Sequence, residues 1–276
     1  MSRPALLLST FLLGLAVLPS LASAAGKCER LIVTGSPDAP PYLWRDPQDP
    51  RHLIGANADL LRQAAESLDM KVEFLYAGKR SQALEEVRTG RMDMLADAPL
   101  IQAQLESLDY IQPPIVQNEI LVWTRHDHAL PFNSLAELHG QPGAVSEKTR
   151  LTQAFEAAAR EHLTLERQPN LTQAFQKLAL GQVEYVLAGR YSGMVMVQTL
   201  GLSADLIAQP EPLDTAGLYL ALSANSACND PWLRGQLVKK MTESAASGLA
   251  GQVIARNLEL WKAQLLQPAG TSAPNK

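Results

Sequence analysis

Two arginines follow predicted strands at positions where open α/β sheets bind their ligands. Arg80 comes after the strand predicted at residues 72–76, and Arg190 comes after the strand predicted at 183–188. Ligands of such sheets lie beyond the carboxyl ends of the strands. If both guanidinium groups point into one cleft, the site is cationic and suits an anion better than a zwitterion. The alternatives are that Arg80 is a solvated side chain and that Arg190 lies at the surface or between two lobes of the protein.

Other polar side chains at strand ends are further candidates for ligand contact. Asp97 follows the strand predicted at 92–96 and could accept a hydrogen bond from a ligand donor. Ser146 and Thr149 lie just before a helix predicted to begin near Leu151. Their hydroxyls and the nearby backbone amides could hold a carboxylate at the helix N-terminus, or they could simply cap the helix.

Aromatic residues follow the first predicted loop. Pro40 and Pro41 remove backbone donors and set the chain direction, and Tyr42 and Trp44 come directly after them. Their faces could form the apolar wall of a ligand pocket, or they could belong to the core. We expect Asp38, in the same loop, to be a turn former.

The sequence contains no pattern typical of an enzyme. His126 and His128 flank Asp127, but two imidazoles without a third ligand nearby do not make a zinc site. Neither a G-x-S-x-G elbow nor a glycine-rich phosphate loop is present. We therefore expect no metal, no cofactor and no catalysis. If the chain were an enzyme after all, Glu147 or Glu184 would be the acid to test.

The first residues are typical of a secretory signal peptide. A basic start at residues 1–3 precedes an apolar stretch at 5–21 and the small residues that end in Ala24. We expect cleavage after Ala24 and export to the periplasm. A membrane anchor is the alternative, but Pro19 and the small residues argue against a spanning helix. Lys27 directly before Cys28 argues against a lipoprotein.

Charge and cysteine content restrict the partners and the compartment. The net charge is -4, with acids and bases interspersed and no basic stripe, so nucleic acid is a poor partner. The two cysteines are Cys28 and Cys228. In an oxidising compartment such a pair often forms a disulfide, which would stabilise the fold by about 4 kcal/mol. The alternative is two free thiols.

Strands and helices alternate along the chain at short spacing. The strands are predicted at residues 31–34, 72–76, 92–96, 115–124, 143–145, 163–166, 183–188 and 218–222. Helices are predicted at 57–68, 81–89, 134–138, 151–159 and 172–180, and a helix or helices at 231–261. This alternation predicts parallel sheet wrapped by helices, in two successive copies of one small α/β layout. The last residues, 267–276, lack apolar periodicity, and we expect them to be disordered.

The order of these landmarks resembles the family 3 extracellular solute-binding proteins. The residues that carry the resemblance are Pro40, Pro41, Tyr42, Gly55, Asp59, Leu60, Gly90, Asp93, Asp109, Tyr110, Pro113, Pro114, Leu135, Gly140, Leu178, Gly181, Leu218, Ser223 and Leu233. The resemblance implies a type II periplasmic binding protein fold, in which two α/β lobes are joined by two hinge strands. Lobe 1 would be residues 25–124 plus 217–266, and lobe 2 would be residues 125–216.

The chain departs from the family at the residues that clamp an amino acid. Where amino acid binders carry an arginine for the ligand carboxylate, this sequence has Gln104. Where they carry an acid for the ligand ammonium, it has Gly189. Arg80 and Arg190 are the candidate replacements for the missing arginine.

The resemblance implies a monomeric periplasmic protein that captures a small polar solute, amino-acid-like or a carboxylate, for an ABC importer. One alternative is a sensing subunit that reports ligand occupancy to a membrane receptor. A less favoured alternative is a dehydratase or lyase on the same scaffold.

Overall fold

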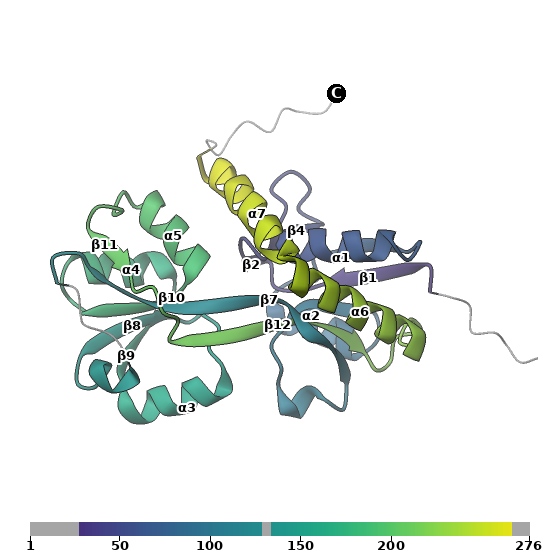
Figure 1. Ribbon diagram of the computed structural model, residues 1–276, viewed down its shortest axis with the longest axis horizontal. Helices are drawn as coiled ribbons and strands as arrows, with labels where there is room; N and C mark the ends of the chain where they lie inside the picture. Colours follow the sequence, from purple (N-terminus) through teal and green to yellow (C-terminus); the bar gives the residue numbers. More distant parts are fainter. Residues whose placement is uncertain (1–27, 129–133, 267–276) are drawn as a thin grey trace, which may run out of the picture.

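The computed structural model describes residues 28–128 and 134–266, which form a mixed α/β fold (Figure 1). The predicted signal peptide at 1–24 and the predicted disordered tail at 267–276 lie outside the described residues. The α-helices are α1 (Ala56–Glu66), α2 (Arg80–Arg88), α3 (Gln153–His162), α4 (Leu171–Ala179), α5 (Arg190–Thr199), α6 (Pro231–Ser247) and α7 (Leu249–Leu266). None of the described helices combines the length and apolar character that a bilayer crossing requires.

One nine-stranded sheet runs through the molecule in the order β5-β1-β6-β12-β7-β10-β8-β9, with β11 beside β7. Its strands are β1 (Arg30–Thr34), β5 (Lys71–Phe74), β6 (Met94–Ala98), β7 (Leu108–Arg125), β8 (Pro142–Ser146), β9 (Thr164–Gln168), β10 (Tyr185–Gly189), β11 (Leu206–Ala208) and β12 (Asp214–Ser223). A small second sheet contains β2 (Asp38–Ala39), β3 (Leu43–Arg45) and β4 (Leu53–Ile54). Two short 3-10 helices, η1 (Gln102–Gln104) and η2 (Leu135–Leu138), complete the described elements.

Two long antiparallel strands connect the halves of the molecule. β7 pairs with β12 at Leu108–Ile111 and again at Val116–Ile120, and from Ile120 to Arg125 it pairs with β10 and β11. β7 therefore belongs to both halves, and Figure 1 shows it beside β12 where the two halves meet. We call the half with β1, β5, β6, α1, α2, α6 and α7 the first lobe, and the half with β8–β11 and α3–α5 the second lobe. The residue limits 25–124 plus 217–266 and 125–216 remain a prediction.

Each lobe buries apolar side chains on both faces of its part of the sheet. In β7, Leu121 and Trp123 pack beneath α4 and α5, whereas Ile120 and Val122 pack toward α3. In β6, Met94 joins the core under α1 and α6. This is the two-residue alternation of a strand covered by helices on both sides. The predicted α/β alternation is thus confirmed in both lobes.

The structure differs from the sequence prediction in one strand, one small sheet and one helix. The strand predicted at 115–124 begins earlier, at Leu108, and continues through Pro113 and Pro114. The sequence also did not predict the small sheet that contains Leu43–Arg45, or helix α5. The sequence left open whether residues 231–261 form one helix or more; they form two, because Gly248 adopts a left-handed conformation with φ 70° and ends α6.

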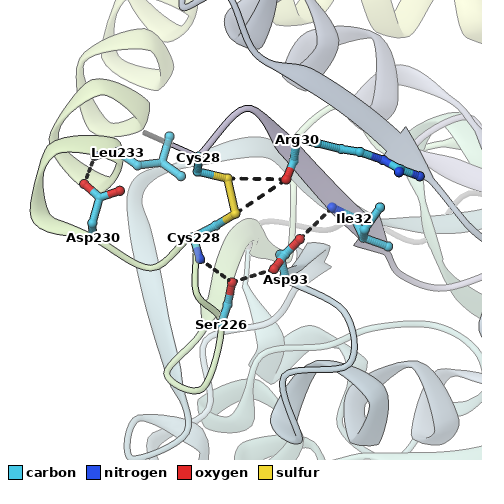
Figure 2. Close-up of a disulfide and its surroundings, with 8 residues drawn as sticks. All are labelled: Cys28, Arg30, Ile32, Asp93, Ser226, Cys228, Asp230 and Leu233. Carbon is cyan, nitrogen blue, oxygen red and sulfur yellow. Dashed lines mark hydrogen bonds between the residues drawn. A yellow bond between two sulfur atoms is a disulfide. The ribbon is translucent and has the colours of Figure 1, made fainter. Parts of the chain in front are cut away.

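The predicted disulfide between Cys28 and Cys228 is present, with Cα atoms 5.2 Å apart (Figure 2). It joins the segment before β1 to the loop before α6. The same place is held by hydrogen bonds: the backbone amide of Cys228 donates to Ser226 Oγ at 3.0 Å, and Ser226 donates to Asp93 at 2.5 Å. Asp93 also accepts from the amide of Ile32 at 2.7 Å. The disulfide therefore closes a site where three distant segments meet.

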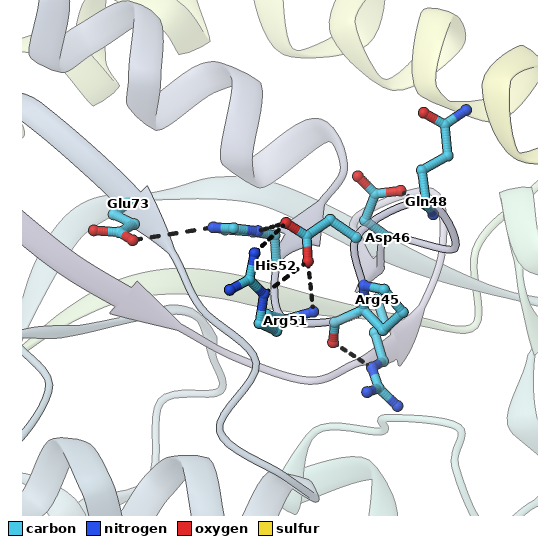
Figure 3. A network of polar contacts seen from close by, with 8 residues as sticks. Arg45, Asp46, Gln48, Arg51, His52 and Glu73 are labelled. Atoms are coloured by element: carbon cyan, nitrogen blue, oxygen red, sulfur yellow. Dashed lines mark hydrogen bonds and ion pairs between the residues drawn. The ribbon is translucent and has the colours of Figure 1, made fainter. Parts of the chain in front are cut away.

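The loop between β3 and β4 is organised around one exposed carboxylate (Figure 3). Asp49 accepts from Arg51 Nε at 3.1 Å and lies 2.8 Å from His52 Nδ1. The hydrogen bonds from Arg51 lower the pKa of Asp49 below its usual range. His52 also lies 4.0 Å from Glu73 on β5, so the loop is tied to the edge of the main sheet.

Candidate functional site

The space between the lobes contains two adjoining cavities. The larger, of about 1080 Å³, is lined by Ser36, Pro37, Asp38, Ala39, Lys79, Arg80, Pro99, Leu100, Ile101, Glu147, Lys148, Thr149, Arg150, Leu151, Thr152, Gln153, Glu156, Arg160, Arg167, Thr215, Ala216, Gly217, Leu218 and Tyr219. Six of these residues are basic and three are acidic, so we call it the cationic compartment. This volume lies near the upper end of the range for small-molecule sites.

The smaller cavity, of about 430 Å³, is lined by Pro37, Asp38, Ala39, Pro40, Tyr42, Trp44, Asn118, Ser146, Lys148, Thr149, Arg150, Asn170, Leu171, Thr172, Gly189, Ser192, Met196, Leu218 and Trp261. Its charged side chains are Asp38, Lys148 and Arg150, which also line the larger cavity. Apolar and neutral polar side chains make up the rest, so we call it the neutral compartment.

Two ion pairs join the lobes beside the compartments, and three of their four residues, Asp38, Lys148 and Arg150, line both cavities. Arg150 of the second lobe pairs with Asp97 of the first at 2.6 Å and also donates to the Asp97 carbonyl at 2.9 Å. The same guanidinium donates to the hydroxyl of Ser36. Lys148 pairs with Asp38 at 2.6 Å across the cleft. The first pair is buried, with side chains 11% and 4% exposed, whereas the second is open to solvent.

Asp97 stays ionised although it is buried. Burial raises the pKa of its carboxyl, but the charge of Arg150, the hydrogen bond from Arg150, the charge of Arg80 and the Ser36 amide together lower it below its usual value. The amide of Ser36 donates to both carboxylate oxygens, at 3.2 and 3.3 Å. A buried charge of this kind is tolerated because it is paired and hydrogen-bonded.

Arg80 lies at the start of α2 and lines the cationic compartment, as its position after β5 predicted. Desolvation in the cleft, and then the nearby charge of Arg150, lower the pKa of Arg80, although part of its surface remains exposed. Asp97 and Asp38 oppose this shift from a distance. The Arg80 side chain forms no hydrogen bond or ion pair with the described residues, so its guanidinium is available to an anion.

Ser146 and Thr149 line the neutral compartment, and Thr149 lines the cationic compartment too. They are not at a helix N-terminus, because α3 begins at Gln153 and its cap is Thr152, which accepts from the amide of Phe155 at 3.1 Å. Ser146 Oγ instead accepts from the amide of Lys148 at 3.2 Å. The hydroxyl therefore shapes the loop that carries Lys148 and Arg150.

Tyr42 and Trp44 are both part of the first-lobe interior and part of the neutral compartment. Their exposed fractions are 5% and 6%. The Tyr42 hydroxyl donates to the carbonyl of Gln117 at 3.4 Å, and the Trp44 indole donates to Gln264 of α7 at 2.9 Å. Desolvation raises the pKa of Tyr42 far above its usual value, so it stays a neutral phenol.

Arg190 does not lie in either cavity, which corrects the expectation of two converging arginines. It is the first residue of α5, and its side chain pairs with Glu119 on β7 and donates to the carbonyl of Pro210 at 3.2 Å. The helix that follows β10 directs this arginine to the hinge strand. This placement agrees with the alternative role for Arg190, that of an interlobe or surface residue.

Arg150 is the cleft arginine that sequence reasoning missed. It lies in the same loop as Ser146 and Thr149, both of which had been singled out, so a basic residue at the end of that loop was the available signal. Gln104, at the position of the family arginine, accepts from the Tyr110 hydroxyl at 3.0 Å. The partner of Arg150, Asp97, is 53 residues away in the sequence, and only the approach of the lobes joins the two.

Of the candidate catalytic acids and metal ligands, Glu184 and His128 lie together, away from Glu147. Glu184 pairs with Arg125 at 2.8 Å, and His128 lies 3.4 Å from the same carboxylate. Glu147 lies on the lining of the cationic compartment. No group of three metal-ligating side chains occurs in the part of the chain that the structure describes.

Comparison with known proteins gives a family and a fold. The family model for bacterial extracellular solute-binding proteins, family 3, matches residues 31–256. No curated protein matches the chain in sequence.

Three solved structures illustrate the similarity. A histidine kinase sensor domain with similarity to periplasmic binding proteins is 21% identical, with a TM-score of 0.61 and coverage of 83% of this chain and 96% of that one. Substrate-binding domain 2 of GlnP from Lactococcus lactis is 17% identical, with a TM-score of 0.62 and coverage of 84% and 97%. The amino acid ABC transporter substrate-binding protein AbpA from Streptococcus pneumoniae, solved with L-arginine, is 16% identical, with a TM-score of 0.59 and coverage of 84% and 95%. At these identities the likeness shows the fold, two lobes joined by two hinge strands.

Proposed function

The chain belongs to family 3 of the bacterial extracellular solute-binding proteins, and we propose that it captures a small anionic solute, amino-acid-like or a carboxylate, between its lobes in the periplasm. The observation that carries this proposal is Arg80, a cleft cation without an ion pair among the described residues. Hinge closure over such a solute would remove water from its contacts with both lobes.

The charge balance of the cationic compartment favours an anion over a neutral or cationic solute. Three ion pairs involve its acids: Asp38 pairs with Lys148, Asp97 with Arg150, and Glu156 with Arg167 at 2.9 Å. With Asp97 counted, the six bases face four acids, which leaves an excess of two positive charges. Arg80 is then the planar cation that can bind a carboxylate through two parallel hydrogen bonds.

Delivery to an ABC importer is the partner role that we propose, in line with the similarity to the S. pneumoniae substrate-binding protein. The similarity to a histidine kinase sensor domain favours a second candidate, in which the closed form reports solute occupancy to a membrane receptor. Reconstitution separates them: an importer subunit stimulates ATP hydrolysis by its permease complex, whereas a sensing subunit changes the activity of its receptor. Recovery of the bound solute unchanged would argue against a dehydratase or lyase.

Arg80→Ala should abolish half or more of the thermal stabilisation that an anionic solute produces. A solute at 100 times its Kd stabilises the native protein by about 2.7 kcal/mol. Loss of a charged hydrogen-bonding partner costs about 1.5–3 kcal/mol, which weakens binding about 10- to 100-fold. Thermal shift screening with dicarboxylates and acidic amino acids, followed by calorimetry, measures this effect.

Arg88→Ala is the matched control for this experiment. Arg88 lies in the last turn of the same helix, where it pairs with the exposed Glu85 at 3.1 Å. The control should respond to solute as the wild-type protein does. An unchanged response in Arg80→Ala would show that Arg80 does not bind the solute. It would contradict the proposal that the cleft binds an anion.

A further inference from the structure

The side-chain amide of Asn118 faces the neutral compartment without a protein partner. Asn118 lies on β7 opposite Ala216 of β12 and is 9% exposed. No residue that the structure describes hydrogen-bonds to its side chain, although it lines the cavity. Its amide is not among the fully buried unpartnered groups, so it is open to the cavity and can hydrogen-bond to a group that enters there.

Gly189 makes room for this amide. A Cβ atom at Gly189 would lie 2.8 Å from Asn118 Oδ1 and 2.9 Å from Ser192 Oγ. Both distances are shorter than a carbon and an oxygen can approach without displacement. The absence of a side chain at Gly189 therefore leaves the Asn118 amide at the cavity wall, and any larger residue would push it away.

The neutral compartment suits an uncharged group. Its charged residues are all paired, Asp38 with Lys148 and Arg150 with Asp97. An ionised group that entered the compartment would lose water without gaining an unpaired counter-charge, which is unfavourable. Hydrogen bonding to Asn118 and contact with carbon surface are what the compartment offers.

The apolar part of the lining is aromatic. Tyr42 and Trp44 come from the first lobe, and Trp261 comes from α7, the helix that contacts α1, α6 and also α5 of the second lobe. The polar atoms of Tyr42 and Trp44 already have partners, so their ring carbons are left for contact with a solute. Aromatic side chains pack favourably against flat rings.

We propose that the neutral compartment is a binding site for a flat, uncharged aromatic or heteroaromatic group that carries an amide, with Asn118 as the residue that recognises the amide. Asn118 offers two donors and one acceptor, and a primary amide on a ring offers the complementary set. The cavity volume of about 430 Å³ accommodates a single substituted ring. Arg80 is not part of this lining, so the proposal does not depend on the anionic site.

Benzamide and nicotinamide, compared with benzoate and nicotinate, test the proposal directly. Each pair keeps the ring and exchanges the neutral amide for a carboxylate. We expect both amides to bind the wild-type protein with Kd below about 1 mM and to quench tryptophan emission, because Trp44 and Trp261 line the site. Absence of amide binding by calorimetry would overturn the proposal.

Asn118→Leu should weaken amide binding at least about 10-fold while leaving the melting temperature unchanged or raised. Leucine keeps the volume but cannot hydrogen-bond, and Asn118 has no described protein partner to lose. The control is Gln117→Leu, since Gln117 is the neighbouring residue on β7 and its side chain is exposed. Equal amide affinity in Asn118→Leu and wild type, or a lower melting temperature in Asn118→Leu, would contradict the assignment.

Gly189→Ala supplies an independent variant that keeps Asn118. Its methyl group should displace the amide and reduce nicotinamide binding, with native far-UV circular dichroism as the check of folding. Arg80→Ala should leave nicotinamide binding unchanged even where it abolishes binding of an anion. The two proposals can therefore fail separately. Unchanged amide binding in Asn118→Leu would contradict the neutral site, and unchanged anion binding in Arg80→Ala would contradict the anionic site.

Discussion

Arg150→Ala should shift the solute-free protein from a closed toward an open arrangement of its lobes. Removing one partner from a buried ion pair costs about 3–5 kcal/mol, because the other charge is left buried and unpaired. In this protein the cost can be relieved by hinge opening, since opening returns Asp97 to water. The ratio of closed to open molecules should therefore fall by more than about 100-fold, and small-angle scattering should show a larger radius of gyration.

Arg160→Ala is the control for this prediction. Arg160 also lines the cationic compartment, but its side chain is 77% exposed and its pairing with Glu156 is within the second lobe, at 4.0 Å. Exposed pairs of this kind contribute little to stability. An unchanged radius of gyration in Arg150→Ala would show that the ion pair does not hold the lobes together.

The same ion pair predicts how closure depends on pH. The pKa of Asp97 is lowered in the folded protein, so its contribution is complete above the usual aspartate value, near 4. It is lost only as the pH falls through the lowered folded value. Scattering at pH 5 should therefore match that at pH 7, and opening between pH 5 and 7 would show that another group controls closure.

Replacement of Cys28 and Cys228 by alanine should lower the free energy of unfolding by about 2–5 kcal/mol. The bond closes a loop with a sequence separation of 200 residues, so it restricts the unfolded chain strongly. For a chain of this size the melting temperature should fall by roughly 5–15 °C. Differential scanning calorimetry measures both quantities.

Reduction of the wild-type protein provides the companion experiment. Treatment with a phosphine reductant should reproduce the melting temperature of the double alanine variant and should have no effect on that variant. Solute binding to Arg80 should persist in both, because the bond lies on the side of the first lobe where β1 begins and not in the cleft lining. Equal melting temperatures with and without the bond would show that local hydrogen bonds already secure this segment.

The local pattern of the sequence was sufficient for the order of strands and helices. Apolar residues at helical spacing, as in Leu60, Leu61 and Ala64, and short apolar strands depend only on neighbouring residues. The strand predicted at 115–124 was too short because Pro113 and Pro114 lack backbone donors. In the fold β7 continues through them, and its pairing with β12 is irregular there, between Ile111 and Val116.

The site was predicted in part, for a similar reason. Arg80, Tyr42, Ser146 and Thr149 reach the cleft because the ends of the strands and the loops that follow them gather at one edge of each lobe. Arg190 satisfied the same rule but lies elsewhere, since the first turn of α5 brings it to Glu119. Position along the chain predicts the edge of the sheet on which a residue lies, and not the direction of its side chain.

The sequence by itself determined the alternating α/β layout, the pair of cysteines and the set of residues at strand ends, because each follows from local composition and spacing. The tertiary structure alone decided that Arg150 meets Asp97 and that Asn118 and Trp261 line one cavity. These contacts join residues from different lobes or distant segments. They depend on the angle at which the hinge strands bring the lobes together, and no neighbouring residue encodes that angle.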